Sequence, residues 1–469
     1  MSASNAAPWA GGRETARRLS NWLGGVGAEL AALAALLLAT AAFGRTFSHI
    51  ELGFSWLHPT EAVLGLVTVV VLVQIGPREA WRRVAATGVL IPLAIFWLFG
   101  AIAAVRGLVE WGFSLTLEDI GLVEYSLLIP IVALTVTSRE QLLWLTTLIG
   151  LSGILAIAVQ SVELWTPSAW DLETQLNLIE VATGMYIGVY VVWVLARLAS
   201  DVPVPRWHQV LMVLGVGLIV VGLSRAAWLA VLAAMALTIL LAVRRRRWVA
   251  ASAAAAAVVL GVAFSIPVEN VGERSRGSDG PNVANEIGAS FEPDGEGGQN
   301  VNARWRLAYW RFTLEESAER PLNGVGFGRP ANFIWNGVPY DRRTGDPSDS
   351  HDVTPPHNSF MNVLYRMGVL AMLAVAAIVL IAVRRLLPVI RRARGEDRAA
   401  AIWLLATLTI TTIVASLAVA LEGPYMGIFF WTGLGLALLA PHLLHAPEGS
   451  SQAPAATARP GVSAANEGQ

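Results

Sequence analysis

Apolar runs of bilayer length recur along almost the whole chain. A membrane-spanning helix needs about 20 predominantly apolar residues, and the chain contains a series of such runs, each placed to within a few residues. They are 24–43, 57–75, 86–104, 119–137, 141–162, 178–198, 208–222, 225–243, 248–266, 358–383, 400–421 and 424–443. The pattern predicts an all-α polytopic membrane protein with about 12 transmembrane helices.

Three of these runs need comment. The runs 208–222 and 225–243 are so close that they predict a tight helical hairpin, whereas 119–137 carries Glu124 inside it and is the weakest of the set. Ala39-Thr40-Ala41 in the first run resembles a signal-peptide cleavage site. The apolar stretch is longer than the usual signal core of about 7–15 residues, so we expect a retained helix. Cleavage would leave eleven helices.

One long polar segment interrupts the pattern between the ninth and tenth predicted helices. Within it, Trp305, Tyr309 and Phe312 have helical spacing and predict an amphipathic helix near 302–320, which Pro321 ends. The tail after Pro447 is rich in Ala, Pro and Ser, which is typical of disorder. The expected organisation is an N-terminal cytoplasmic tail (1–23), helices one to nine (24–266), a large loop (267–357), helices ten to twelve (358–443) and a disordered cytoplasmic tail (444–469).

Arginine placement predicts the orientation, because short cytoplasmic loops carry an excess of basic residues. With the N-terminus inside, the short outer loops hold only Arg45, Arg106 and Arg225. The cytoplasmic segments then hold Arg13, Arg17, Arg18, Arg78, Arg82, Arg83, Arg139, Arg197, Arg206, Arg244 to Arg247, Arg384, Arg385, Arg391, Arg392, Arg394 and Arg398. Both termini are therefore expected in the cytoplasm, and the loop 267–357 is expected to be extracytoplasmic.

Composition agrees with a membrane protein and excludes several kinds of chemistry. Only 14% of residues are charged and 55% are hydrophobic, whereas soluble proteins average about 25% charged residues. The net charge of -1 gives no basic footprint for nucleic acid. The absence of cysteine excludes disulfides, thiolate nucleophiles, cysteine-ligated zinc and iron–sulfur clusters.

His357 opens the strongest local pattern in the chain, His357-Asn358-Ser359-Phe360, at the predicted start of the tenth helix. Asn358 or Ser359 is suited to cap that helix. An imidazole at this lip is suited to general acid–base catalysis, and a nearby arginine would lower its pKa. A capping-region histidine without chemistry is the alternative interpretation.

Arg225 lies at the predicted N-terminus of the eighth helix, within Ser224-Arg225-Ala226-Ala227-Trp228. A cation there opposes the helix dipole, yet free backbone N–H groups and a guanidinium together suit an anion such as phosphate. The alternative is an interfacial arginine that extends to lipid headgroups.

Within the predicted loop helix, Arg306 and Trp310 share one face, as do Arg304 and Arg311. This helix therefore either rests on anionic lipid or holds an anionic ligand. The glycines that follow, from Gly324 to Gly328, lack the surrounding βαβ unit of a dinucleotide site and predict a tight turn instead.

Acidic side chains in the outer halves of the predicted spans are a further group of candidates. Carboxylates inside a membrane are functional candidates by default, so Glu61, Glu124 and Glu180 are suited to bind sugar hydroxyls or orient His357, unless they are interfacial residues at helix starts. Four residues of the loop are close in sequence and could bind a divalent ion: Asp341, Asp346, Asp349 and His351. They fit a solvated loop better, so the metal site is the weaker interpretation.

The order of these motifs resembles the O-antigen ligase and polymerase family of bacterial cell envelopes. Family members begin a helix with Ser-Arg-Gly/Ala-x-Trp, here Ser224 to Trp228, and carry Arg-x-x-x-Trp in a long outer loop, here Arg306 to Trp310. A Pro-Leu-x-Gly-Val-Gly-x-Gly stretch follows, here Pro321 to Gly328, and then a His-Asn-x-Phe/Leu motif, here His357 to Phe360 with Gly368 beyond it. The resemblance covers about residues 210–385.

The resemblance implies a metal-independent, inverting membrane glycosyltransferase without a cofactor, located in the cytoplasmic (inner) membrane with its active site facing outward. Its donor would be a saccharide on undecaprenyl diphosphate, and its acceptor a glycan, lipid or protein. His357 matches the family's proposed catalytic residue, and Arg225 and Arg306 match its diphosphate-contacting arginines. Arg304, Trp310, Asn358, Glu124 and Glu180 are further candidate substrate contacts.

The main alternative is a lipid-linked saccharide flippase or a secondary transporter, which the number of predicted spans also suits. Such folds tend to show repeated halves and paired broken helices, and we find neither in the sequence. Ligase and polymerase are not separable by these motifs.

Overall fold

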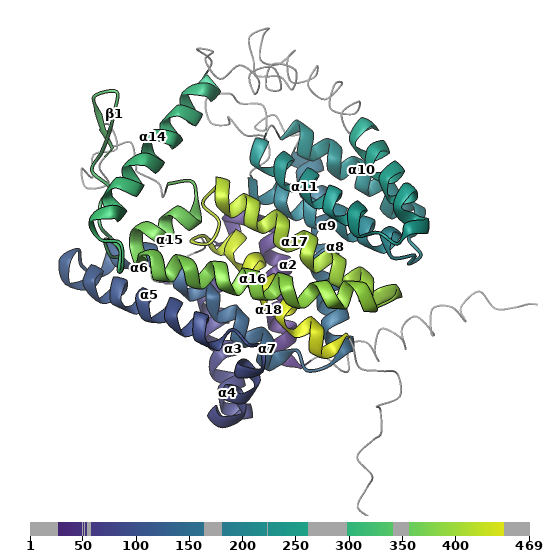
Figure 1. Cartoon of the computed structure of the whole chain (residues 1–469), viewed down its shortest axis with the longest axis horizontal. Helices are drawn as coiled ribbons and strands as arrows, with labels where there is room; N and C mark the ends of the chain where they lie inside the picture. The colour runs from purple at the N-terminus through teal and green to yellow at the C-terminus, as the bar shows by residue number, and fades with distance from the viewer. Residues whose placement is uncertain are drawn as a thin grey trace, which may run out of the picture.

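The structure is a computed structural model that describes residues 27–48, 50, 52–53, 58–163, 181–222, 224–260, 298–340 and 356–444. Within this part of the chain the fold is a bundle of α-helices with one two-stranded β-hairpin (Figure 1). The N-terminal half contains the helices α2 (Ala28–Ser48), α3 (Pro59–Ile75), α4 (Pro77–Ala86), α5 (Leu90–Glu110), α6 (Phe113–Glu124), η1 (Tyr125–Leu127), α7 (Leu128–Thr135), α8 (Arg139–Glu163), α9 (Val181–Ala199), α10 (Arg206–Val221), α11 (Arg225–Leu241) and η3 (Arg244–Arg246).

The C-terminal part contains α14 (Gly298–Glu319), the strands β1 (Phe333–Trp335) and β2 (Val338–Tyr340), and then α15 (Ser359–Met367), α16 (Val369–Arg392), α17 (Gly395–Leu417) and α18 (Pro424–Leu443). The strands pair antiparallel, with Trp335 opposite Val338. Asn336 and Gly337 form the turn between them with positive φ angles of 50° and 79°, which is the backbone that a two-residue hairpin favours.

Burial divides the apolar helices into an inner and an outer set. Most of the apolar length of α9, α17 and α18 is buried inside the bundle, whereas α5 and α16 are buried for only about a third of theirs. Large apolar side chains on α5 such as Ile91 and Val109 are largely exposed, at 74% and 81%. A helix that is apolar all round but buried on one side only requires an apolar surrounding, so the chain is an all-α membrane protein.

The described helices correspond closely to the apolar runs but not always one to one. Six of them are long and apolar enough to span a membrane, or seven if the bent pair α3 and α4 forms one span. Three further apolar helices are shorter, at Ala28–Gly44, Arg206–Val220 and Arg225–Leu241. Residues 247–260 are also helical. The total of twelve spans stays a prediction.

Two of the expected continuous helices are interrupted. The run 119–137, the weakest of the predicted set, corresponds to the end of α6, η1 and α7, and the 3₁₀ helix η1 begins directly after Glu124. The run 358–383 consists of α15 and α16, which are separated at Gly368. This glycine has a φ of +87° and approaches the Leu322 carbonyl so closely that a Cβ atom would collide with it. A hydropathy profile cannot detect such a break, because both halves are apolar.

The two ends of α17 lie in different surroundings. At its first turn, Glu396 pairs with Arg197 and Asp397 pairs with Arg139, and Arg398 donates to the Leu241 carbonyl at the end of α11. Because the end of α11 meets the start of α17, these two packed helices run antiparallel. At the other end of α17 lie α15 and α14, and α14 crosses this end of the bundle beside β1 (Figure 1).

Candidate active site

His357 lies on a short connection that is fastened on both sides. On the preceding side, the indole of Trp310 in α14 donates a hydrogen bond of 2.6 Å to the Pro356 carbonyl. On the following side, the Asn358 side chain caps α15 by accepting from the Met361 N–H at 3.1 Å. His357 itself has a φ of +46°, a backbone conformation that non-glycine residues rarely adopt and that clusters at functional sites.

The surroundings of the His357 ring favour the neutral imidazole. The ring is half-buried and meets the Trp305 ring edge to face, with 5.9 Å between ring centroids. The pKa of His357 is lowered to about 4, chiefly by burial and in addition by the Arg306 guanidinium. The expected effect of a nearby arginine is thus present, but burial is the larger cause. A neutral imidazole is able to accept a proton near pH 7.

Arg306 joins α14 to the end of α17. Its Nη1 donates a hydrogen bond of 3.0 Å to the carbonyl of Leu417, the last residue of α17. The side chain is half-buried, and burial lowers its pKa. A cation at a helix C-terminus complements the negative end of the helix dipole, so this contact helps to fix the position of Arg306.

The arginines of α14 lie in different surroundings. The inner face of the helix carries Trp305, Tyr309 and Phe312, which pack against Phe333 of β1, with 4.9 Å between the Tyr309 and Phe333 ring centroids. Arg306 is held on the bundle side by its bond to Leu417. Arg304 and Arg311 are exposed, and Arg311 pairs with Glu315 on the same helix. The structure therefore brings Arg306, but not Arg304, close to His357.

Arg225 occupies the first position of α11, as the motif predicted. Ser224 is the N-cap, and its hydroxyl accepts from the Ala227 N–H at 3.4 Å. The Arg225 side chain is half-buried, and its Nη2 atom is buried. The helix N-terminus is thus capped by a side chain in the manner expected of a stable helix start.

The register between α11 and α17 places Arg225 near the same end of the bundle as Arg306. Val231 of α11 and Ile410 of α17 both lie against Gly188 of α9. Because α11 and α17 run antiparallel, six positions back from Val231 to Arg225 correspond to six positions onward from Ile410, within the last turn of α17. The three residues singled out by sequence therefore belong to one end of the bundle.

The connection between α17 and α18 contributes contacts that sequence analysis missed. The Glu422 carboxylate accepts hydrogen bonds from the Ser359 hydroxyl and from the Asn362 side-chain amide, the latter at 2.9 Å. The Ser359 hydroxyl also accepts from the backbone N–H groups of Ala420 and Leu421, at 2.8 and 3.0 Å. The only sequence signal for these contacts is the position of Glu422 between the apolar runs 400–421 and 424–443.

The glycine-rich segment after α14 is a structural clamp, in agreement with the predicted turn. Gly324 has a φ of +61°, and a Cβ atom there would lie 2.5 Å from the backbone of Arg366. Arg366 and Asp119 form a buried ion pair at 3.2 Å, with side chains only 7% and 2% exposed. Asp119 also accepts from the Gly328 N–H at 2.7 Å. This pair, which sequence analysis did not identify, ties the loop to α6 and α15.

The acidic candidates fall into two groups. Glu61 accepts a hydrogen bond of 2.7 Å from the Tyr125 hydroxyl, and half-buried Glu124 is the residue next to Tyr125. The Tyr125 ring in turn lies against Gly427 near the start of α18. Glu180 lies outside the described residues, as do Asp341, Asp346, Asp349 and His351. The part of the chain that the structure describes contains no cluster suited to hold a metal ion.

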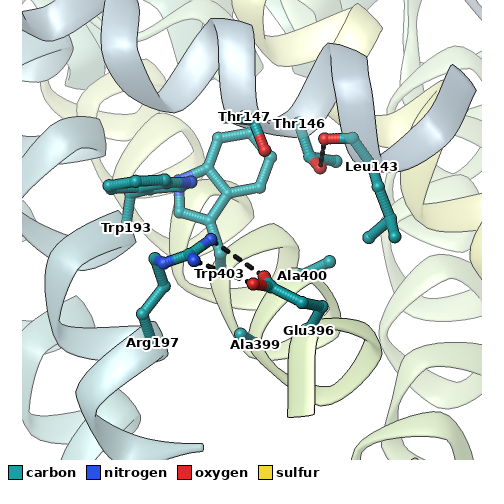
Figure 2. A pocket seen from close by; sticks show the side chains of 9 residues that line it. All are labelled: Leu143, Thr146, Thr147, Trp193, Arg197, Glu396, Ala399, Ala400 and Trp403. Carbon is teal, nitrogen blue, oxygen red and sulfur yellow. Dashed lines mark hydrogen bonds and ion pairs between the residues drawn. The ribbon is translucent and has the colours of Figure 1, made fainter. Parts of the chain in front are cut away.

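A second polar site lies at the opposite end of α17 and is too small for a substrate. Figure 2 shows Arg197 and Glu396 facing each other in a bidentate ion pair beside Trp193 and Trp403. The cavity between them measures about 10 Å³, which is room for about one water molecule. We regard it as a structural ion pair that joins α9 to α17.

Comparison with known proteins agrees with the motifs. Residues 210–376 match the family model described as O-antigen ligase. The matched region contains Arg225, Arg306 and His357 but excludes Asp119 and Glu422. No curated protein matches the chain.

Proposed function

Because residues 210–376 match the family model described as O-antigen ligase, we propose that this membrane protein transfers a saccharide from an undecaprenyl-diphosphate carrier to an acceptor hydroxyl. Family membership itself indicates a membrane glycosyltransferase of the O-antigen ligase or polymerase type. The carrier, the outer face of the cytoplasmic membrane as the place of reaction, and a glycan, lipid or protein acceptor are parts of the proposal.

In the proposed reaction the acceptor oxygen attacks the anomeric carbon of the donor. A new glycosidic bond forms while the bond from the anomeric carbon to the diphosphate oxygen breaks. The acceptor proton passes to His357, and the lipid diphosphate leaves with the bonding electron pair. Direct attack inverts the anomeric configuration. Arg225 and Arg306 stabilise the charge that develops on the leaving diphosphate, as preorganised guanidinium groups do in a partly desolvated site.

The observation that carries this proposal is the juxtaposition of Arg306 and His357. In α14, Trp305 contacts the His357 ring and Trp310 donates to the Pro356 carbonyl. The helix that carries Arg306 therefore also holds the imidazole. A general base and an anion-stabilising cation are thus fixed by one helix. Sugar transfer from a diphosphate uses a base for the acceptor proton and positive charge for the leaving group.

The low pKa of His357 fits a base that acts beside bound anions. A catalytic base is most effective when its pKa lies near the working pH, and a pKa of about 4 is below that optimum. A diphosphate held by Arg306 brings negative charge next to the ring and therefore raises the imidazole pKa. Donor binding would in this way activate the base.

The deciding experiment incubates the purified full-length protein with undecaprenyl-diphosphate-linked repeat units and follows new glycosidic bonds by mass spectrometry. We expect products with an inverted anomeric centre, formed at the same rate with and without EDTA. A ladder of lengthened chains without added acceptor indicates a polymerase, and a single transfer to an added lipid or protein acceptor indicates a ligase. Movement of the donor across the vesicle membrane without a new glycosidic bond would instead favour the transporter alternative.

Substitution of the base provides the matched test. His357→Ala is expected to lower the transfer rate by about 10²–10⁴-fold, the usual contribution of general base catalysis, while donor binding through the arginines persists. His351→Ala is the control on the same polar segment and is expected to keep full activity. If His351→Ala is inactive and His357→Ala is active, the assignment of the base is wrong.

A further inference from the structure

We infer that Glu422 is a positioning residue that fixes the first turn of α15 and, through it, the His357 imidazole. The role rests on the proposed function for its catalytic meaning, but its geometry is independent of that function. Glu422 lies between the end of α17 at Leu417 and the start of α18 at Pro424, beyond the region matched by the family model. It touches neither of the groups proposed to react, so it acts through α15.

The hydrogen bonds around Ser359 determine which acceptor receives its hydroxyl proton. A serine hydroxyl has one proton and two acceptor lone pairs. The N–H groups of Ala420 and Leu421 occupy the lone pairs. The proton is therefore available for one acceptor, and Glu422 lies closer than the alternative, the Ala418 carbonyl at 3.3 Å. Ser359 and the α17–α18 connection thus form a closed set of hydrogen bonds two residues after His357.

A carboxylate suits this arrangement because both of its oxygens accept hydrogen bonds. One Glu422 oxygen accepts from Ser359 and the other accepts from Asn362. A glutamine or a protonated carboxyl would present a donor at one of these positions, so it keeps both contacts only if the Asn362 amide reverses and turns its buried Oδ1 towards residue 422. Burial raises the pKa of the Glu422 carboxyl, and the hydrogen bonds from Ser359 and Asn362 oppose that rise by favouring the charged form. The net shift of this pKa is upward, so the geometry of the two contacts, rather than the charge of Glu422, carries the positioning role.

The same connection also receives the arginine of the site. Arg306 donates to the Leu417 carbonyl, five residues before Glu422. The segment from Leu417 to Glu422 therefore contacts both α14, which carries the cation, and α15, which follows the base. A shift of this segment changes the distance between the two proposed catalytic groups. Small displacements of this kind are costly, since misplacement of a reacting group by about 1 Å lowers rates by about 10²-fold.

The test compares Glu422→Gln with the wild-type chain in lipid nanodiscs, using a readout that needs no transferase activity. Diethyl pyrocarbonate modifies neutral imidazoles, and peptide mass spectrometry gives the modification rate of His357 separately from the other histidines. We expect Glu422→Gln to raise that rate by about threefold or more, because the half-buried ring loses its fixed position. In the transfer assay we expect kcat to fall about 10–100-fold, with KM for the donor changed less than twofold.

Three further variants make the result specific. Glu315→Gln changes an exposed carboxylate on α14 and is expected to leave both readouts unchanged. Glu422→Asp keeps two acceptor oxygens and is expected to recover part of kcat. Asn362→Ala removes one of the two donors and is expected to give an intermediate modification rate, which tests the role if Glu422→Gln fails to fold.

The outcomes separate this inference from the proposed function. A His357 modification rate in Glu422→Gln and Asn362→Ala equal to that of the wild type overturns the positioning role, whatever the activity. If the wild-type protein transfers no saccharide, the proposed function fails, while the modification rates still decide whether Glu422 positions the ring.

Discussion

The two ends of α17 use charged residues in different ways. At the Gly395 end, Glu396 and Asp397 each pair with an arginine from a neighbouring helix, at 2.8 and 2.6 Å. The Leu417 end also has an ion pair nearby, between Arg366 and Asp119, but there two further charged residues contact neutral groups. Arg306 binds a carbonyl, and Glu422 binds a hydroxyl and an amide. The helix has 23 residues, so the ends lie about 35 Å apart.

This difference separates structural from functional charge. A carboxylate paired with an arginine neutralises it and holds two helices together, which leaves little charge for a ligand. The Leu417 carbonyl holds the Arg306 guanidinium without itself neutralising the positive charge. Preorganised charge of this kind stabilises a developing anion without reorganisation at the moment of reaction. The comparison teaches that the partner of a charged residue, rather than its presence, identifies the candidate site.

The largest expected effect concerns the sides of the membrane on which the two ends lie. A reporter that is active only outside the cytoplasm is expected to be active when fused after Gly298, at the start of α14, and inactive when fused after Arg394, just before α17. The arginine-rich loops predict this orientation. The opposite pattern of activity would place the proposed site in the cytoplasm and overturn its role in transfer to an outer acceptor.

The next effect is the loss of an anion-binding arginine. Arg225→Ala is expected to lower the transfer rate by about 10²–10³-fold, the usual loss when one group that stabilises developing charge is removed. Arg225→Lys is expected to recover only part of it, because an ammonium keeps the charge but lacks the bidentate fork. Steady-state rates on protein shown to be folded and inserted provide the measurement. Near-normal turnover of Arg225→Ala would mean that Arg225 only contacts lipid headgroups.

A smaller effect concerns the pH dependence of the rate. The pH profile of kcat/KM reports the free enzyme and that of kcat reports the donor complex. Activity needs neutral His357, so kcat/KM is expected to fall with decreasing pH around a midpoint of about 4. The midpoint for kcat is expected at a higher pH, because bound diphosphate favours the imidazolium. Rates measured between pH 3.5 and 8 give both values.

Arg306→Gln sharpens this test. Removal of the neighbouring positive charge is expected to raise the midpoint of kcat/KM, while burial, the larger cause, keeps it below the ordinary value of 6.5. A wild-type midpoint for kcat/KM at or above 6.5 would show that burial and Arg306 do not lower the pKa of His357 in the free enzyme.

The smallest effect is expected at the opposite end of α17. Glu396→Gln removes an ion pair whose side chains are 48% and 19% exposed, so the free energy of unfolding is expected to fall by no more than about 1 kcal/mol. Arg197 keeps its contact over the Trp193 ring at 4.8 Å. Thermal unfolding measures the loss, and kcat/KM of the folded protein is expected to stay unchanged. A tenfold loss of kcat/KM would instead mean that both ends of α17 serve the reaction.

Much of the fold follows from local sequence. The apolar runs and the polar residues between them predicted most of the described helices, because the hydropathy of a helix depends only on its own residues. The Ser224 and Asn358 caps and the helix over Trp305 to Phe312 also follow from short-range patterns. The sequence marked the run that contains Glu124 as weak, but it predicted no break at Gly368. This break arises from close packing of Gly368 against Leu322, which no profile along the chain contains.

The candidate site divides in the same way. By itself, the sequence determined a helical membrane protein and pointed to Arg225, Arg306 and His357 through motifs, each a few residues long. Only the tertiary structure decided which face of α14 reaches the bundle, so that Arg306 contacts Leu417 while Arg304 is exposed. It also decided that Glu422 binds Ser359, although 63 positions separate them. Hydrogen bonds of this kind depend on how distant helices align, and that alignment is fixed by packing of the whole bundle rather than by the residues next to each group.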